Sequence, residues 1–269
     1  WRLLDTLGCG DYVCHLNERH AAFATLERMR TYCERHKVSF DEALWATRAG
    51  NIFTTHTPVA AGFDRYPIEV LRRYIDEFSQ QLGVPAERLL ALGKANPEDS
   101  TEWFNMAWLA MRTCAFANGV SALHGAVSRT IFQPLFPRWP EREVPIGHVT
   151  NGVHVPTWDS SRADNEWRQL FGPDASGPDR WLDNHRLWQM KGQGRAQLVD
   201  YVRRRLGHQW RRESDPGQCA VFSEQPLDPN VLTLGFARRF AEYKRPNLLL
   251  HNPDRLAALL NHPQHPVQL

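Results

Sequence analysis

The chain has 269 residues, a hydrophobic content of 42% and a formal net charge of +2 at pH 7. This composition excludes collagen-like and low-complexity disordered proteins, and the absence of any run of about 18 apolar residues excludes a membrane-spanning bundle. The 32 basic and 30 acidic residues lack the clustered basicity of a nucleic-acid-binding domain. We therefore expect a cytoplasmic protein of one large or two ordinary domains, with no membrane or nucleic-acid partner.

The first part of the chain shows helical periodicity. Apolar residues recur at helical spacing, Ser39 and Glu42 have the spacing of a capping box, and Pro67 and Gly83 bracket the clearest amphipathic stripe. The dipeptide Asn118-Gly119 is interpreted as a helix break. The predicted helices cover residues 21–36, a short stretch ending at 45, 67–82, 103–117 and 120–131.

The pattern changes after a proline-rich connection. Pro134, Pro137, Pro140 and Pro145 are incompatible with regular structure and predict a long loop. Beyond residue 158 a short helical piece and a basic helix follow. The first buried strand is predicted after these, then a helix and a second strand, which together indicate the opening β-α-β unit of a parallel sheet. These elements are expected around Trp167 and at residues 183–206, 231–236, 246–260 and from 267 onward.

The five cysteines are odd in number and include no CxxC pair, so we expect reduced thiols at Cys9, Cys14, Cys33, Cys114 and Cys219. Cys9 and Cys14 lie near His15 and His20, but this spacing lacks the loop between ligand pairs that zinc fingers have. We therefore predict no metal site.

The densest charged cluster, residues 238–245, directly follows the predicted strand. Ligands of parallel sheets bind beyond the carboxyl ends of the strands, and Arg and Lys suit phosphate oxygens. The cluster therefore indicates an anion site, with a solvated basic turn as the alternative. Residues 17–20, 54–58 and 148–152 carry donors and acceptors suited to sugar hydroxyls, although ordinary turns have the same composition.

Several motifs are absent from the sequence. It has no Walker P-loop, GxGxxG, HExxH or GxSxG, so nucleotide hydrolases, zinc proteases and α/β-hydrolases lose their usual support.

Five blocks of the chain, in order, resemble the α-glucan (glycogen or maltodextrin) phosphorylases of the short bacterial and archaeal type. The blocks are CHLNERHAAFATLERMR, NIFTTHTPVAAGFDRYP, FNMAWLAMRTCAFANGVSALHGAVSR, VPIGHVTNGVHVPTW and LTLGFARRFAEYKRPNLL. The resemblance implies an α/β fragment of a GT-B enzyme, in which two Rossmann-like domains face a cleft. Residues 1–152 would be the end of the glucan-side domain, and residues 153–269 the truncated start of the cofactor-side domain.

The resemblance also implies the reaction and its participants. Orthophosphate would cleave the terminal α-1,4 bond of a glucan and release α-D-glucose 1-phosphate, with pyridoxal 5'-phosphate as cofactor. The cofactor's phosphate group, not its aldehyde, works in catalysis in this family. Family members are often homodimers.

Motif matches imply the role of each site residue. Arg239 and Lys244 would hold the substrate phosphate, and His56 and Asn151 the glucosyl 6-hydroxyl, with the His56 carbonyl facing the developing positive charge. The other implied residues are Glu18 and His20, lining the sugar pocket, and Arg238 and Trp158, near the cofactor.

The chain also departs from the family pattern. Arg19 stands where the family usually has glycine, and Ala60 where proline is common. The match covers only the middle of a phosphorylase, the chain starts at Trp1 without a methionine, and the cofactor lysine segment has no counterpart. We therefore expect the 269-residue chain alone to release no glucose 1-phosphate.

Other functions remain open at this stage. A GT-B transferase similar to glycogen synthase would use a sugar nucleotide instead of phosphate. A glucan-binding relic would bind without turnover. A nucleic-acid binder could use the Arg-rich helix, although a solvated helix face is the commoner cause of such a pattern.

Overall fold

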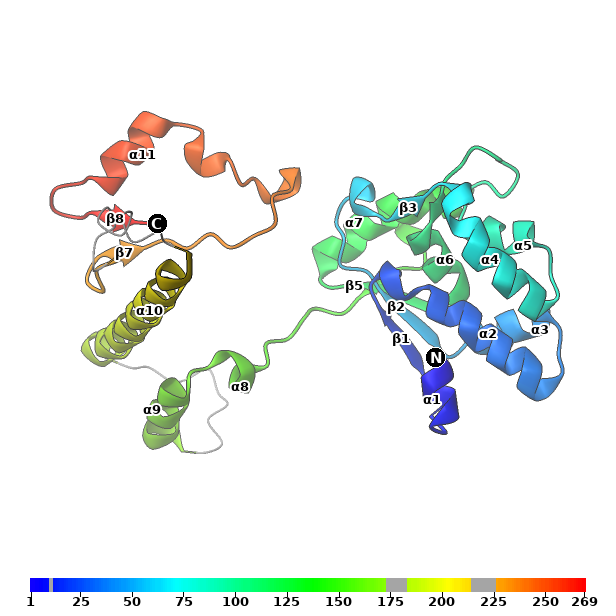
Figure 1. Ribbon diagram of the computed structural model, residues 1–269, viewed down its shortest axis with the longest axis horizontal. Coiled ribbons are helices and arrows are strands. Elements are labelled where there is room, and N and C mark those ends of the chain that lie inside the picture. The colour runs from blue at the N-terminus through cyan, green and yellow to red at the C-terminus, as the bar shows by residue number, and fades with distance from the viewer. Residues whose placement is uncertain (10–11, 173–182, 214–225) are drawn as a thin grey trace. The chain divides into compact units, whose positions relative to one another are not determined.

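The computed structural model of the chain describes residues 1–9, 12–172, 183–213 and 226–269. The chain divides into two compact units, Trp1–Val153 and His154–Leu269 (Figure 1). Their assignment to a glucan-side and a cofactor-side domain stays a prediction. Within the described ranges, no helix has the length and apolarity needed to cross a bilayer.

A parallel sheet organises the first unit. Its strands, in the order β1-β2-β5-β6, are β1 (Cys14–Asn17), β2 (Asn51–Thr54), β5 (Phe116–Gly119) and β6 (Gly147–His148). Asn17 pairs with Thr54, Thr54 with Asn118, and Asn118 with Gly147. The carboxyl ends of the four strands therefore meet at one edge, where the connections to the next elements begin.

This sheet corrects two expectations from the sequence. The first part of the chain is mixed α/β and not purely helical, because its strands of two to four residues are too short for a period-2 pattern to stand out. Residues 116–119 form β5 and not a helix end followed by a break. The preceding helix ends at Thr113, and Cys114 is already extended, with φ −115° and ψ 141°.

Helices surround the sheet, and most lie where the sequence predicts them. The capping box is confirmed, since Ser39 N donates to Glu42 Oε2 at 2.8 Å and Glu42 N to Ser39 Oγ at 3.3 Å. Gly83 ends its helix with a left-handed φ of 66°. The helices are α1 (Arg2–Thr6), α2 (Phe23–His36), α3 (Phe40–Arg48), α4 (Ile68–Leu82), α5 (Ala86–Ala91), α6 (Met106–Thr113) and α7 (Ala122–Phe132).

Short elements complete the first unit. The proline-rich connection contains two single 3₁₀ turns before β6, in agreement with the predicted loop. The 3₁₀ turns are Arg19–Ala21, Ala60–Gly62, Gln133–Leu135 and Glu141–Glu143, and β3 (Arg65–Tyr66) pairs antiparallel with β4 (Phe104–Asn105).

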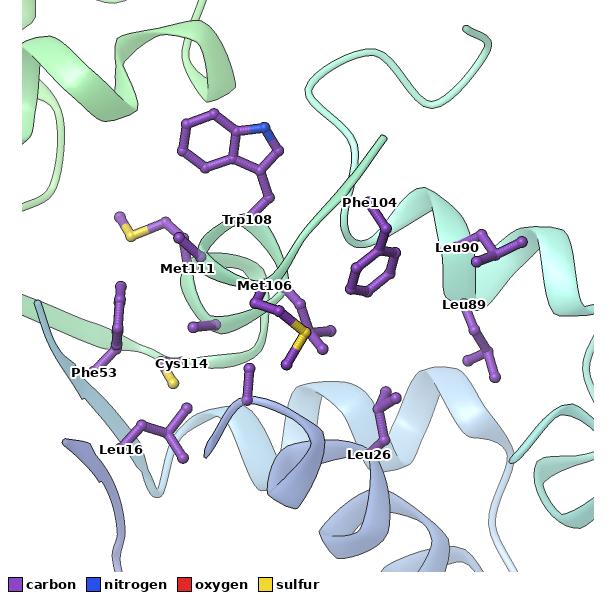
Figure 2. Packing of buried hydrophobic residues seen from close by; sticks show 14 of the residues in the cluster. Leu16, Leu26, Phe53, Leu89, Leu90, Phe104, Met106, Trp108, Met111 and Cys114 are labelled. Atoms are coloured by element: carbon purple, nitrogen blue, oxygen red, sulfur yellow. The ribbon is translucent and has the colours of Figure 1, made fainter. Parts of the chain in front are cut away.

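The hydrophobic core lies between the sheet and the helices. Figure 2 shows side chains of β1, β2, β4, α2, α5 and α6 meeting there, among them the fully buried Phe53, Leu26 and Phe104. Helix α6 is buried on nearly every face. Asn51 is also fully buried, and its Nδ2 donates to Thr113 O at 2.7 Å, which ties β2 to the end of α6.

A buried carboxylate joins α1 to α2. Glu27 is 8% exposed and accepts from Arg30 Nη2 and Arg2 Nε, both at 2.7 Å. Burial alone would raise the pKa of Glu27, but the hydrogen bonds from Arg30 and Arg2 outweigh it and hold this pKa below its usual range.

The second unit contains the predicted β-α-β unit in a smaller form. Strand β7 (Leu232–Thr233) pairs in parallel with β8 (Val267–Gln268), and α11 (Pro253–Leu260) connects them. The strand expected at 231–236 is shorter and more exposed than predicted, with Phe236 55% exposed, because this sheet has only two strands among the described residues. Asn252 caps α11, so the helix starts later than residue 246.

The other elements of the second unit are mostly helical. The basic helix is confirmed and continues beyond its predicted end. The helices are α8 (Val155–Trp158), α9 (Ser161–Phe171) and α10 (Asn184–Glu213), with 3₁₀ turns at Glu242–Lys244 and Leu248–Leu250.

The described cysteines are free thiols: Cys9, Cys14, Cys33 and Cys114. Cys219 lies outside the described residues. Burial and the neighbouring Cys14 thiol raise the pKa of Cys114 to about 12, so this thiol stays protonated at neutral pH. Across the described ranges, no group of three or more His, Cys, Asp or Glu residues could hold a metal ion.

The turn from β5 to α7 requires glycine at position 119. A Cβ there would lie 2.8 Å from Gly125 N and from His124 Nδ1, closer than van der Waals contact allows. We predict that Gly119→Ala lowers the free energy of unfolding by about 1–3 kcal/mol in urea denaturation. Gly147→Ala is the matched control, because a Cβ at Gly147 meets open space. Equal stability of the two variants would contradict this packing.

The Glu27 contacts predict a pH-dependent contribution to stability. Because the folded-state pKa lies below the unfolded one, the contribution is present above about pH 4.5 and is lost as the pH falls through the folded-state pKa. The difference in unfolding free energy between the wild type and Glu27→Gln should therefore shrink from about pH 6 to about pH 3. The control is Glu98→Gln on an exposed turn, and a pH-independent difference for Glu27→Gln would show that Glu27 is not held as a carboxylate.

Candidate functional site

Polar side chains gather at the carboxyl edge of the parallel sheet. Glu18 follows β1, His56 follows β2, Asn118 lies in β5, and Asn151 follows β6. Parallel α/β sheets bind ligands beyond the carboxyl ends of their strands. This edge is therefore the candidate site of the first unit.

The His56 side chain is exposed, and its ring is held from one side. Its Nε2 lies 2.6 Å from Asn17 Oδ1, and because a carbonyl oxygen only accepts, the ring donates through Nε2–H. In the neutral form of the ring, Nδ1 is then an acceptor for a ligand hydroxyl. The backbone N–H of His56 donates to Glu18 Oε2 at 3.2 Å, so the main chain is fixed as well as the ring.

Glu18 occupies a strained backbone position. Its φ of 80° and ψ of 163° belong to a region that side-chain-bearing residues rarely adopt, at a cost of about 1–3 kcal/mol. Its carboxylate accepts from Thr57 Oγ1 at 2.6 Å and from Arg19 N at 3.3 Å, and pairs with Arg19 Nη1 at 3.1 Å. These charge-assisted contacts offset the backbone strain.

A chain of hydrogen bonds crosses three strands beside this site. His15 Nε2 donates to Thr54 Oγ1 at 2.7 Å, and Thr54 Oγ1 donates to Asn118 Oδ1 at 3.0 Å. Asn118 Nδ2 donates in turn to Gly119 O at 3.1 Å. The chain links β1, β2 and β5 by side chains as well as by backbone pairing, so their carboxyl ends keep one relative position.

Asn151 and His20 are exposed residues of the same edge. The segment after β6 continues along β5, with Val149 N donating to Gly119 O at 3.0 Å and Asn151 N to Val120 O at 3.2 Å. Strand β5 lies between β2 and β6, so the segments that carry His56 and Asn151 are two strand spacings apart, about 10 Å. His20 lies in the 3₁₀ turn that follows β1.

The predicted phosphate-binding residues lie in the second unit. Arg238 and Arg239 are exposed in the segment after β7, and Lys244 ends a 3₁₀ turn with its Nζ 4.7 Å from the centre of the Tyr243 ring. Lys244 also lines an open pocket of about 610 Å³, together with residues of the segment after β7 and of α11. The other lining residues include Arg245, Arg255, Leu234 and Phe236. The cationic character expected of this segment is thus present on the surface of the unit.

The residues present do not form a pyridoxal phosphate site. Trp158 ends α8 with 80% of its surface exposed, and Arg238 is exposed as well. Side chains this exposed do not enclose a cofactor. We therefore derive no step through this cofactor.

The sequence-predicted residues thus fall into two sets. Glu18, His20, His56 and Asn151 lie at the sheet edge of the first unit, and Glu18 contacts His56. The second unit carries the other set, Trp158, Arg238, Arg239 and Lys244.

Sequence reasoning missed the residues that hold His56 in place. Asn17 and Arg19 belong to a segment singled out for its polar character, yet neither was expected to contact the segment after β2. The signal that could have found them is their position at the carboxyl end of a strand, which required β1 and β2 to be predicted first.

Comparison with known proteins identifies the family. A model of the carbohydrate phosphorylase family matches residues 9–171. A glycogen phosphorylase of Mycobacterium tuberculosis is 44% identical over 96% of this chain and 31% of its own length. A maltodextrin phosphorylase of Thermococcus litoralis is 34% identical over 100% of this chain and 32% of its own length. A glycogen phosphorylase of Aquifex aeolicus is 30% identical over 99% of this chain and 39% of its own length.

The chain belongs to the carbohydrate phosphorylase family, as its sequence blocks predicted. It spans between 31% and 39% of the length of these three relatives.

Proposed function

We propose that this chain supplies part of the machinery that phosphorolyses α-1,4-glucans, as a segment of a cytoplasmic GT-B enzyme. The observation that carries the proposal is the carboxyl edge of the parallel sheet, where the exposed His56 and Asn151 follow β2 and β6. Relatives named glycogen and maltodextrin phosphorylases support it. Their names favour phosphorolysis over transfer from a sugar nucleotide and over binding without turnover.

The proposed reaction exchanges one bond at the anomeric carbon. The bond from glucosyl C1 to O4 of the next residue breaks, C1 bonds to an oxygen of orthophosphate, and a phosphate proton passes to the O4 of the shortened glucan. The products are α-D-glucose 1-phosphate and a glucan one unit shorter. Atoms and charge balance without an added oxidant or reductant.

In this reaction His56 and Asn151 would hold the terminal glucosyl unit. The His56 Nδ1 is placed to accept from a sugar hydroxyl, and the Asn151 amide offers both a donor and an acceptor. The His56 carbonyl would face the positive charge that develops at C1, where an oriented dipole stabilises the transition state. His20 would border this sugar pocket.

Arg239 and Lys244 would hold the substrate phosphate. A guanidinium matches two phosphate oxygens at once, and an ammonium adds a compact charge. Because these cations would neutralise the substrate phosphate, it could lie close to the phosphate group of the proposed cofactor. Arg238 and Trp158 stay the proposed neighbours of a pyridoxal phosphate whose binding group this chain does not supply, and a homodimer is the proposed assembly of the complete enzyme.

A hybrid enzyme tests this function. The matching segment of the mycobacterial relative is replaced by this chain, and release of glucose 1-phosphate from glycogen and orthophosphate is measured. We predict an active hybrid in which Arg239→Ala and Lys244→Ala each lower kcat/KM by about 100-fold or more, because an electrostatic contact to the reacting group is lost.

The matched control is Arg142→Ala in the same hybrid. Arg142 is a cation whose side chain is 85% exposed, so its removal should leave kcat/KM unchanged. A soluble, folded hybrid that releases no glucose 1-phosphate would contradict the proposal, and so would equal losses in the three variants.

A further inference from the structure

We propose that Asn17, Glu18 and Arg19 form an anchor that fixes the His56 loop, here defined as residues 55–64, and that Glu18 and Arg19 serve the site by positioning His56 and not by touching the sugar. The effect of the anchor on catalysis rests on the proposed function. The anchoring itself stands on contacts within the first unit.

The three consecutive residues hold three different parts of the loop. Asn17 Oδ1 receives the His56 ring N–H at 2.6 Å, and Glu18 Oε2 receives the His56 backbone N–H at 3.2 Å. Arg19 reaches the far end, where its Nη2 donates to Gly62 O and its Nε lies 3.2 Å from Asp64 Oδ2. The guanidinium also lies over the Phe63 ring, 5.6 Å from its centre. Both ends of the loop are therefore tied to the segment that follows β1.

Thr57 joins the two charged residues of the anchor. Its Oγ1 donates to Glu18 Oε2 at 2.6 Å and accepts from Arg19 Nη1 at 2.9 Å. One hydroxyl thus bridges a carboxylate and a guanidinium that also pair directly. Removal of this hydroxyl would disturb both ends of the anchor while leaving the two charges in place.

The two charged residues of the anchor, Glu18 and Arg19, have little capacity left for a substrate. The Glu18 and Arg19 side chains are only 15% and 12% exposed. Glu18 Oε2 already receives three donors, and Oε1 faces the N–H of Arg19. Their contacts hold the loop that carries the exposed His56 ring, so Glu18 and Arg19 are positioning residues.

The contacts of Arg19 give a structural reason for an arginine at a position where the family usually has glycine. A glycine at this position would leave Gly62, Phe63 and Asp64 without the contacts that the guanidinium makes. In this chain the far end of the loop is held by a charged side chain.

The first test measures the loop directly in the 269-residue chain. In hydrogen exchange we expect Thr57→Val and Arg19→Gly to speed exchange of the His56, Gly62 and Phe63 amides by 10-fold or more, while amides of β5 and α6 keep their rates. Thr57→Ser keeps the hydroxyl and should exchange like the wild type.

In ¹⁵N spectra, Asn17→Ala should reduce the fraction of the His56 ring protonated at Nε2. Unchanged exchange in both Thr57→Val and Arg19→Gly would overturn the anchor, whatever the activity.

The second test measures the catalytic consequence in the hybrid enzyme. Displacing a reacting or binding group by about 1 Å can cost 100-fold in rate. We expect Thr57→Val to lower kcat by about 10- to 100-fold with the KM for orthophosphate unchanged, and Thr57→Ser to restore kcat. Faster loop exchange with an unchanged kcat in an active hybrid would overturn the positioning role. An inactive wild-type hybrid would instead contradict the proposed function. The hydrogen-exchange result would then show by itself whether the anchor holds the loop.

Discussion

Parallel pairing of four short strands is the constraint on which the site depends. Because β1, β2, β5 and β6 run in the same direction, each delivers its following residues to one edge. The register places Asn17, Thr54 and Asn118 side by side, so short side chains there can reach one another. The hydrogen-bond chain through Thr54 and the contacts of His56 both follow from this register, and a slip of one residue in β1 would remove them.

The site combines local strain with charge pairing that supports it. Glu18 holds an unfavourable positive φ, which persists only where the surroundings determine the backbone. The Glu18 carboxylate is held by the Arg19 guanidinium, the Thr57 hydroxyl and two backbone N–H groups, and these contacts fix the backbone. The result is a rigid support beneath an exposed imidazole, the arrangement needed to meet a ligand hydroxyl in one geometry.

Local sequence signals predicted much of the fold. The Ser39 capping box and the Gly83 helix end each depend on residues close together in the chain, and both are confirmed. The β-α-β unit near residue 232 is confirmed as well, because the apolar run that predicts its first strand stands out locally. The first sheet was missed because strands of two to four residues carry too little periodicity, and their stability comes from pairing across distant segments. Arg19 shows the same limit, since its partners lie 38 to 45 residues further along the chain.

Glucan binding at the sheet edge is the central claim, and a titration of the ¹⁵N-labelled chain with maltoheptaose at millimolar concentrations tests it most directly. The account predicts saturable shifts of the amides of His56, Thr57 and Asn151, and their loss in a folded His56→Ala variant. Shifts confined to other surfaces, or none at all, would contradict the claim that this edge holds the sugar.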